Sequence, residues 1–218
     1  HPFIRPGPVR HPACIPPPTR SGAHLCHSTS MPHCTPVLLR FGSADASESH
    51  LARLRDGLSA VVQTGPHLWV LCDEGAALDR LTVQPDGTFG DHRSFPLADY
   101  LDLPGGDGQE ADLEGLASDP PYPWIVGWHS RKRRKPDGSG DVATLAEVER
   151  EDRRYLLARV RLEADAVTGE LVPRPRTTYA HGEATAARLR GEGNDGALMD
   201  ALRKDPHLRR FLKIPGKD

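Results

Sequence analysis

The sequence predicts a mainly β protein with short inserted helices, and three observations support this fold class. Proline and glycine contribute 21 residues each to the 218, about a fifth of the chain, which favours many short elements joined by turns. Residues 155–163 alternate apolar and polar side chains, the pattern of a half-buried strand. Pro85-Asp86-Gly87 is a strong turn signal, so the segments on either side of it are predicted to pair as strands.

Turn signals also separate the other predicted strands. Gly65-Pro66 precedes an apolar run that is typical of a buried strand, and Thr168-Gly169 precedes a short apolar segment. Because side chains alternate along a strand, Trp124, Val126 and Trp128 are expected on one face. In chain order, the predicted strands are residues 36–41, 59–63, 67–72, 77–83, 88–97, 111–117, 124–129, 155–163 and 170–172.

Helices are predicted in the intervals between these strands. Residues 98–103 are expected to form a short helix or turn, and residues 143–152, 183–190 and 197–204 are helical by composition. Pro206 is suited to open one further turn, with Asp205 as its cap.

The first 34 residues differ in composition from the rest of the chain. They contain eight prolines, five histidines, three arginines and no acidic residue, and they show no period of 2 or 3.6. We expect a non-globular leader here, either disordered or translated from upstream of a true start at Met31. Residues 35–218 are predicted to form the folded domain.

The overall composition is that of a globular protein without a general bias toward nucleic acid. Hydrophobic residues make up 37%, charged residues 27%, and the net charge is −2. No apolar run approaches the ~20 residues that a membrane-spanning helix needs. The four cysteines do not have the spacing of a disulfide framework, so a cytoplasmic location is expected.

The segment Asp112-Leu113-Glu114-Gly115 stands out because it places two acids two residues apart beside a glycine. On a strand, residues i and i+2 share a face, so the two carboxylates are expected side by side. A similar acid–glycine feature, Asp73-Glu74-Gly75, follows the apolar run at residues 67–72. Two such features, each near an apolar strand, indicate a repeat of about 50 residues, the scale of a propeller blade.

Several stretches in the same order resemble the bacterial domain-of-unknown-function family 3616. They are residues 68–74, 78–81, 89–95, 97–101, 110–117, 126–136 and 206–218. The resemblance implies a β-propeller-like domain with no established activity. Family members continue from Pro215-Gly216-Lys217-Asp218 into a second Asp-x-Glu-Gly-Leu signature, so it also implies an N-terminal portion only, truncated at the C-terminus. The Asp-x-Glu-Gly pattern is similar to one in phytase-like propellers, where acids line a metal-containing channel.

Asp112 and Glu114 are therefore candidate calcium ligands, with Asp73 and Glu74 as weaker candidates. Calcium takes several oxygen ligands, and two carboxylates supply only a start. The same acids can instead cap turns near Gly115, or act as a general acid and base. The expected function is a ligand- or metal-binding scaffold. One alternative is a metal-assisted phosphoester or ester hydrolase of phytase-like type, and the other is a polyanion-binding module that uses the basic run at residues 131–135. The scaffold and the hydrolase both imply a small-molecule or phosphorylated ligand as partner.

A basic run and a His-Ser pair complete the candidate sites. The run is Arg131, Lys132, Arg133, Arg134 and Lys135. It can bind a polyanion, but charge runs in loops are usually solvated and no aromatic residues interleave this one, so nucleic acid is not favoured as a partner. His129-Ser130 invites a hydrolase interpretation, but neighbouring side chains on a strand point to opposite faces, which favours a structural role. The three tryptophans are expected in the core.

Overall fold

The computed structural model describes residues 35–42, 47–105, 111–133, 148–149, 151–191 and 193–212. Contacts divide the chain into two units, His1–Pro36 and Val37–Asp218, and nearly all described residues belong to the second. The predicted leader, residues 1–34, lies outside the described residues.

The first sheet is a four-stranded antiparallel meander. Its strands are β1 (Leu58–Thr64), β2 (His67–Cys72), β3 (Ala77–Val83) and β4 (Phe89–Pro96), and each pairs with the next along the chain. Tight turns connect the strands where glycine adopts a positive φ, as at Gly65 and Gly87. The Asp86 carboxylate accepts a hydrogen bond from the Thr88 backbone N–H at 3.0 Å, which fixes the second of these turns.

The second sheet is also a four-stranded antiparallel meander, with longer connections. It contains β5 (Leu113–Asp119), β6 (Tyr122–Gly127), β9 (Leu157–Arg159) and β14 (Ala187–Arg188), again in chain order across the sheet. Two-stranded pairs interrupt it. They are β7 (Lys132–Arg133) with β8 (Val148–Glu149), β10 (Arg161–Ala164) with β11 (Leu171–Arg174), and β12 (Arg176–Tyr179) with β13 (Gly182–Thr185).

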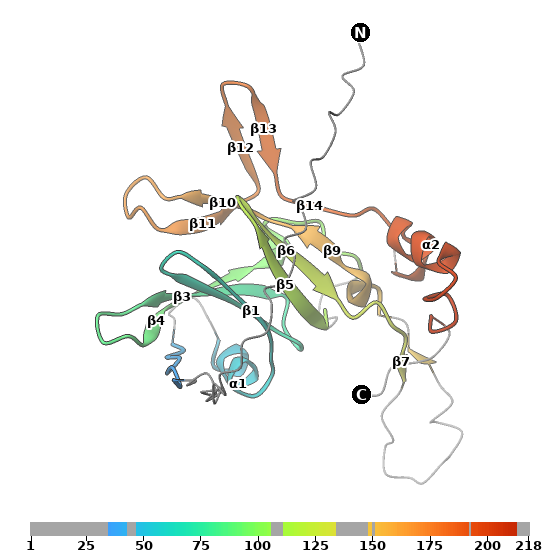
Figure 1. Ribbon diagram of the computed structural model, residues 1–218, viewed down its shortest axis with the longest axis horizontal. Helices are drawn as coiled ribbons and strands as arrows, with labels where there is room; N and C mark the ends of the chain where they lie inside the picture. The colour runs from blue at the N-terminus through green and yellow to red at the C-terminus, as the bar shows by residue number, and fades with distance from the viewer. Residues whose placement is uncertain are drawn as a thin grey trace, which may run out of the picture. The chain divides into compact units, whose positions relative to one another are not determined.

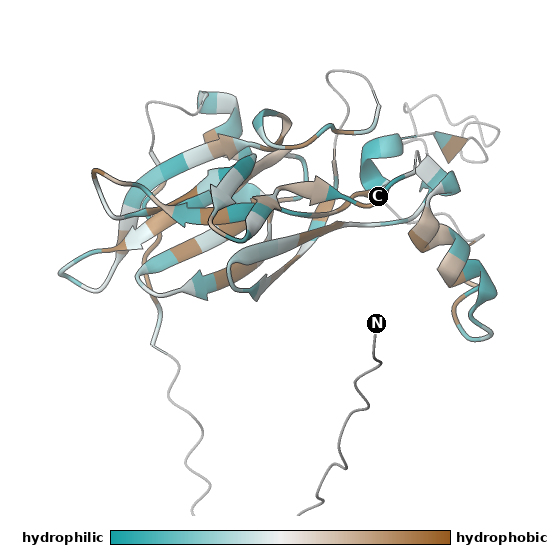
Figure 2. Ribbon diagram, turned by 90° about the horizontal axis from the view of Figure 1, so that it is seen from above, coloured by the Kyte–Doolittle hydropathy of each residue, from teal (hydrophilic) through white to brown (hydrophobic). Residues whose placement is uncertain are grey.

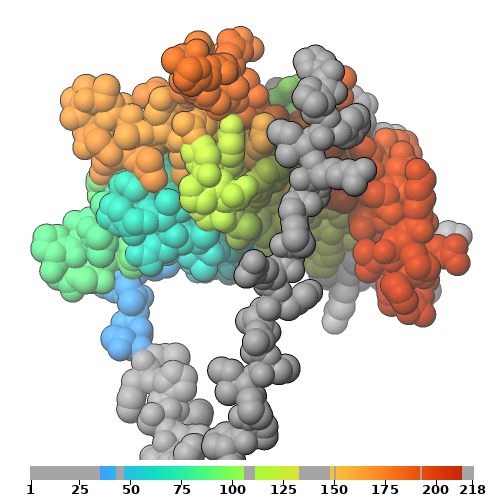
Figure 3. All heavy atoms as spheres, turned by 45° about the horizontal axis from the view of Figure 1, so that its top comes forward, coloured from blue at the N-terminus to red at the C-terminus, as the bar shows by residue number. Residues whose placement is uncertain are grey.

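The two sheets share one hydrophobic core. Trp69 and Leu78 of the first sheet belong to the same buried cluster as Leu113, Ile125 and Ala158 of the second. The first strands of the two sheets lie side by side (Figures 1 and 3), and the Ser59 hydroxyl donates a hydrogen bond to the Leu113 carbonyl oxygen. Figure 2 shows hydrophobic and hydrophilic residues alternating along the strands, as expected when each strand has one buried face.

Helix α1 (Glu48–Asp56) covers the other face of the first sheet. The Ser47 hydroxyl caps the helix by accepting a hydrogen bond from the His50 backbone N–H at 3.2 Å. Leu51 and Leu54 project from the helix onto a second buried cluster, whose members from the sheet include Val70 and Leu81.

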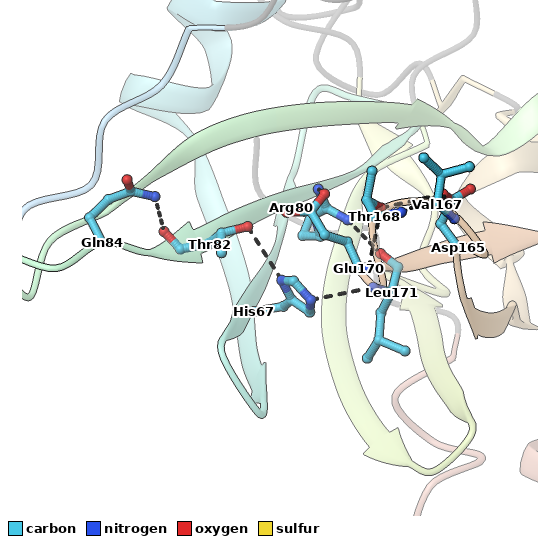
Figure 4. Close-up of polar contacts among 9 residues, drawn as sticks. All are labelled: His67, Arg80, Thr82, Gln84, Asp165, Val167, Thr168, Glu170 and Leu171. Atoms are coloured by element: carbon cyan, nitrogen blue, oxygen red, sulfur yellow. Dashed lines mark hydrogen bonds and ion pairs between the residues drawn. The ribbon is translucent and has the colours of Figure 1, made fainter.

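A buried arginine ties the first sheet to the β10–β11 hairpin (Figure 4). The Arg80 side chain is fully buried and donates hydrogen bonds to the Leu171 carbonyl oxygen at 2.7 Å and to the Glu170 carboxylate at 2.5 Å. The neighbouring His67 ring accepts a hydrogen bond from the Leu171 backbone N–H at 3.3 Å. Burial and the charge of Arg80 lower the pKa of His67, which matches its role as a neutral acceptor.

The predicted fold class is confirmed at the level of a mainly β protein with short helices. Strands β1 to β6 and helix α2 (Ala197–Lys204) lie where the sequence predicts them within a few residues. The short helix or turn expected at residues 98–103 corresponds to a 3₁₀ turn, η1 (Leu97–Asp99). The Asp205 cap is also confirmed, because its carboxylate accepts hydrogen bonds from the backbone N–H groups of His207 and Leu208.

Several element predictions are wrong. The helix expected at residues 183–190 consists of β13 and β14, because this segment pairs with β12 and β9. A helix was also expected at residues 143–152. The described residues of this segment include strand β8, and residues 141–147 lie outside the described residues. The strand expected at residues 155–163 is divided into the end of a 3₁₀ helix, η3 (Asp152–Tyr155), then β9 and β10. The segment at residues 36–41 forms only a single bridge, from Leu39 to Phe89, and α1 was not predicted.

We predict that replacing Gly127 with alanine destabilises the protein. A Cβ atom at Gly127 would lie 2.6 Å from the Arg154 carbonyl oxygen and 3.2 Å from that of Ala111, and both are backbone atoms that cannot rotate away. Overpacking of this kind costs about 1–3 kcal/mol. Urea denaturation should show the loss in Gly127→Ala and no comparable loss in Gly42→Ala, since nothing lies within 4 Å of a Cβ there. Equal stability of the two variants would contradict this packing.

Candidate functional site

The Asp112–Gly115 segment does not have the regular strand geometry that the sequence suggests. Asp112 precedes β5 and has a φ of 40°, in the left-handed region. Leu113 pairs with Gly127 and Gly115 with Val126, so Glu114 is an extra residue in a β-bulge. A bulge changes the direction of side chains relative to a regular strand. The i and i+2 geometry of a regular strand therefore does not apply to these two residues.

Asp112 is the counterion of a buried arginine. The Arg154 side chain lies in η3 and is almost completely buried, and its Nη1 atom is 2.7 Å from the Asp112 carboxylate. The Arg154 guanidinium also stacks over the Trp128 ring, 5.1 Å from its centroid. A second carboxylate, that of Glu151, lies 3.9 Å from the same Nη1 atom. These contacts give Asp112 a structural role that differs from the turn capping considered from the sequence.

Glu114 is exposed and lies close to an acid of the other sheet. Partial burial of its carboxyl and the negative charge of Asp73 raise the pKa of Glu114 above its usual value, although Arg154 opposes the shift. Asp73 directly follows β2, and β5 contacts both β1 and β2. The negative charge of Asp73 thus acts on Glu114, although the two residues belong to segments of different sheets.

Asp73 and Glu74 line a cavity of about 280 Å³ at the end of α1. The other lining residues are Ala52, Arg53, Asp56 and Gly57. The Asp73 backbone N–H donates to the Gly57 carbonyl oxygen at 3.1 Å, and the Asp73 carboxylate accepts from the Glu74 N–H at 2.8 Å. A Cβ at Gly57 would lie 2.3 Å from the Asp73 Oδ1 atom, so glycine permits this close approach.

Within the described part of the chain, no group of three or more His, Cys, Asp or Glu side chains is arranged to hold a metal ion. Asp73 and Glu114 together supply two carboxylates. A calcium ion bound there would need further oxygen ligands, such as backbone carbonyls and water.

The basic run is only partly described. Arg131 is exposed, whereas Lys132 lies in β7 and its Nζ atom donates to the Glu151 carboxylate at 3.0 Å. Arg133 belongs to β7, but its side chain, like residues Arg134 and Lys135, lies outside the described residues. The prediction of a polyanion site at this run stays a prediction.

The three tryptophans differ in burial. Trp69 is fully buried in the shared core, as expected. Trp124 is half-buried, and 41% of the Trp128 surface is exposed. Trp124 lies on the less buried face of β6, and the buried face is the opposite one, which carries Ile125. The core assignment is therefore correct for Trp69 and wrong for Trp128.

A buried polar cluster beneath α1 was not predicted. The Asp79 carboxylate is fully buried and accepts hydrogen bonds from the Nε2 atoms of His92 at 2.8 Å and His50 at 3.1 Å, and Ser94 Oγ lies 3.3 Å from the same His50 atom. Burial alone would raise the pKa of Asp79, but the hydrogen bonds from the two histidines outweigh burial and lower it. The only sequence signal was an acid within the apolar segment at residues 77–83.

Comparison with known families agrees with the resemblance seen in the sequence. A family model described as protein of unknown function (DUF3616) matches residues 57–218, and the chain therefore belongs to this family. The match covers both sheets, from β1 onward. No curated protein and no solved structure matches the chain. None of the helices in the described residues is long and apolar enough to cross a membrane.

We predict that Asp112→Asn destabilises the protein by about 3 kcal/mol, because it leaves the buried Arg154 charge without its closest counterion. Asparagine tolerates a positive φ, so the variant tests the charge rather than the backbone conformation. Asp119→Asn, at the exposed opposite end of β5, is the matched control. Urea denaturation at pH 7 measures both variants, and an Asp112→Asn midpoint equal to that of the control would disprove the counterion role.

Proposed function

We propose that the chain forms two adjacent blades of a β-propeller-type scaffold and binds a ligand at the junction between them. Propeller blades are four-stranded antiparallel sheets arranged around a central axis. Both sheets here have four strands in chain order, which supports this arrangement. The contact between the first strands of the two sheets supports it further, because first strands face the axis in a propeller. A ring of four to eight blades would need further sheets beyond these two.

The ligand we propose is a cation, with calcium as the first choice. The observation that carries this proposal is the approach of Asp73 and Glu114 from two different sheets at the same end of the junction. Two carboxylates that repel each other in the free protein gain most when a divalent cation lies between them. Backbone carbonyl groups and water would supply the remaining oxygen ligands. In this proposal Asp112 orients the site through Arg154 rather than binding the ion.

Calcium titration by calorimetry tests the proposal directly. We expect binding by the wild-type chain and a loss of about tenfold or more in affinity in Asp73→Asn and in Glu114→Gln. Asp119→Asn carries the same charge change on β5 but lies at its other end, so it should bind as the wild type does. No heat of binding up to about 10 mM calcium, beyond the weakest range of protein calcium sites, would rule the proposal out.

The affinity for calcium should also depend on pH. A proton competes with the cation for Glu114, and the raised pKa of this carboxyl means that the competition begins at a higher pH than for an ordinary glutamate. Binding is therefore expected to be complete at neutral pH and to weaken as the pH falls through the raised pKa. Calorimetry at pH 7.5 and pH 5.0 measures the change, which should be smaller in Glu114→Gln. A pH dependence unchanged by that substitution would assign it to another group.

A further inference from the structure

The two four-stranded sheets carry the same pair of side chains at equivalent positions. In each sheet a two-residue turn joins the first and second strands, and a tryptophan is the third residue of the second strand, Trp69 in β2 and Trp124 in β6. Each tryptophan pairs in register with an arginine of the third strand, Trp69 with Arg80 and Trp124 with Arg159. The two sheets thus repeat a Trp–Arg pair on one of their faces.

In the first sheet this face is covered. Trp69 and Arg80 are fully buried, and Trp69 belongs to the core cluster that contains Ile125 and Ala158 of the second sheet. The Arg80 guanidinium donates to the carboxylate of Glu170, in the β10–β11 hairpin that follows the third strand of the second sheet (Figure 4). The next sheet along the chain therefore completes this face with apolar side chains and a counterion.

In the second sheet the same face is partly exposed. Ile125 and Ala158 pair in register and pack in the core shared with the first sheet, so the alternating side chains of Trp124 and Arg159 point to the opposite side. Trp124 and Arg159 are only partly buried, and Trp124 belongs to neither of the two buried clusters. The Trp–Arg pair of the second sheet thus lacks the cover that the pair of the first sheet has.

Arg159 is held in place but has no counterion. Its guanidinium lies 4.6 Å from the centroid of the Tyr122 ring and 5.7 Å from that of Trp124, and among the described residues it forms no ion pair. An arginine fixed by ring contacts loses little conformational freedom when an anionic partner arrives. The neighbouring Arg161 lies 5.8 Å from the Tyr122 ring centroid, and its buried Nε atom has no hydrogen-bond partner within the described chain. This face therefore favours a partner that brings a carboxylate.

An apolar cavity lies on the same face. It measures about 180 Å³, and its lining residues are Trp124, Leu157, Arg159, Ala187, Arg188 and Leu189. The Arg188 side chain is paired with Asp102, so the charge at this cavity that lacks a counterion is that of Arg159. An apolar cavity of about 150 Å³ accommodates a benzene-sized group. The space therefore suits one aromatic or branched side chain of a partner.

We propose that this face of the second sheet is the interface for a third four-stranded sheet, formed by residues of the same protein that follow Asp218. The third sheet places an apolar side chain in the cavity and a carboxylate against Arg159, as the second sheet does for Trp69 and Arg80. The inference rests on the proposed arrangement of the sheets as successive blades, and it names the residues through which the next blade attaches.

A second copy of the chain is a poorer occupant of this face. Two copies joined face to face would bring Arg159 and Arg161 of one copy into the same interface as those of the other, and like charges in one interface are costly. In the interface between the first two sheets, both sheets belong to one chain, and the covering sheet comes later in it. The same order places a third sheet after the second.

Photocrosslinking tests the interface in the protein as its natural host produces it. The photoreactive p-benzoylphenylalanine replaces Leu189, which lines the cavity and is 43% exposed, or, as a control, Val167, which is 93% exposed between β10 and β11. We expect position 189 to crosslink to a residue after position 218 of the same polypeptide, in clearly higher yield than position 167. The proposal is overturned if position 189 crosslinks only to residues 1–218, to a second copy or to another protein, if it does not crosslink, or if the two yields are equal.

The carboxylate is tested by Arg159→Gln, with Arg176→Gln as the matched control because the Arg176 side chain is 65% exposed and pairs with Glu183 at the surface. In the natural protein the thermal midpoint of Arg159→Gln should fall by about 5 °C or more, since a covered carboxylate loses its partner, and that of the control should not. In the 218-residue chain Arg159→Gln loses only ring contacts, so the shift should be no more than about half as large. Equal shifts in the two proteins would disprove the carboxylate partner.

This inference and the proposed calcium site can fail separately. The interface uses Trp124, Arg159 and Leu189, whereas the proposed calcium ligands are Asp73 and Glu114 at the junction of the first two sheets. Arg159→Gln should therefore bind calcium as the wild type does in calorimetry. Absence of the crosslink with calcium binding intact would remove the third sheet alone, and the crosslink without calcium binding would remove the cation site alone.

Discussion

The burial of Arg154 is the interaction on which the candidate site depends. Its guanidinium, excluded from water, requires a close carboxylate, and Asp112 provides it at 2.7 Å. Asp112 does so from a left-handed backbone conformation immediately before β5. The backbone of Arg154 is equally constrained, because its carbonyl oxygen accepts the His129 N–H and leaves no room for a side chain at Gly127. One arginine thus sets the positions of residues from β5, β6 and η3 and moderates the pKa of Glu114.

The elements that were predictable from the sequence are those whose local pattern agrees with their tertiary contacts. Strand β2 is an apolar run buried on both faces, and helix α2 has an apolar face and a cap signal after its end, so both lie where the sequence predicts them. The segment at residues 183–190 reads as helical, but its partners β12 and β9 lie elsewhere in the chain and decide its conformation. Helix α1 shows the converse. Its leucines pack on the first sheet, and only knowledge of that sheet explains its stability.

The candidate site could be located from the sequence, but the roles of its residues could not. The acid–glycine segment was recognisable, and its position at the end of the sheet junction justifies attention to it. The partner of Asp112 lies 42 positions later, at Arg154, between a helix predicted at residues 143–152 and a strand predicted at residues 155–163. Pairing over this distance leaves no trace in spacing or periodicity. The state of His129 likewise depends on the folded chain. Its Nδ1 atom lies 2.7 Å from the Gly127 carbonyl oxygen, and burial lowers its pKa, and neither can be read from the dipeptide His129-Ser130.

The four positions of Asp112-Leu113-Glu114-Gly115 have separate physical functions, and this bears on the idea of a repeat. Asp112 neutralises a buried charge, Leu113 enters the shared core, and Glu114 occupies the bulge. Gly115 is required by packing, since a Cβ there would lie 2.5 Å from a methyl group of Val126. The Asp73-Glu74-Gly75 feature follows β2, the second strand of the first sheet. The Asp112–Gly115 feature lies at the start of β5, the first strand of the second sheet. Because β1 and β2 are antiparallel, both features still lie at the same end of the junction. The repetition is therefore in the four-stranded sheets, and the two acid–glycine segments meet because of that architecture, without being equivalent copies of one motif.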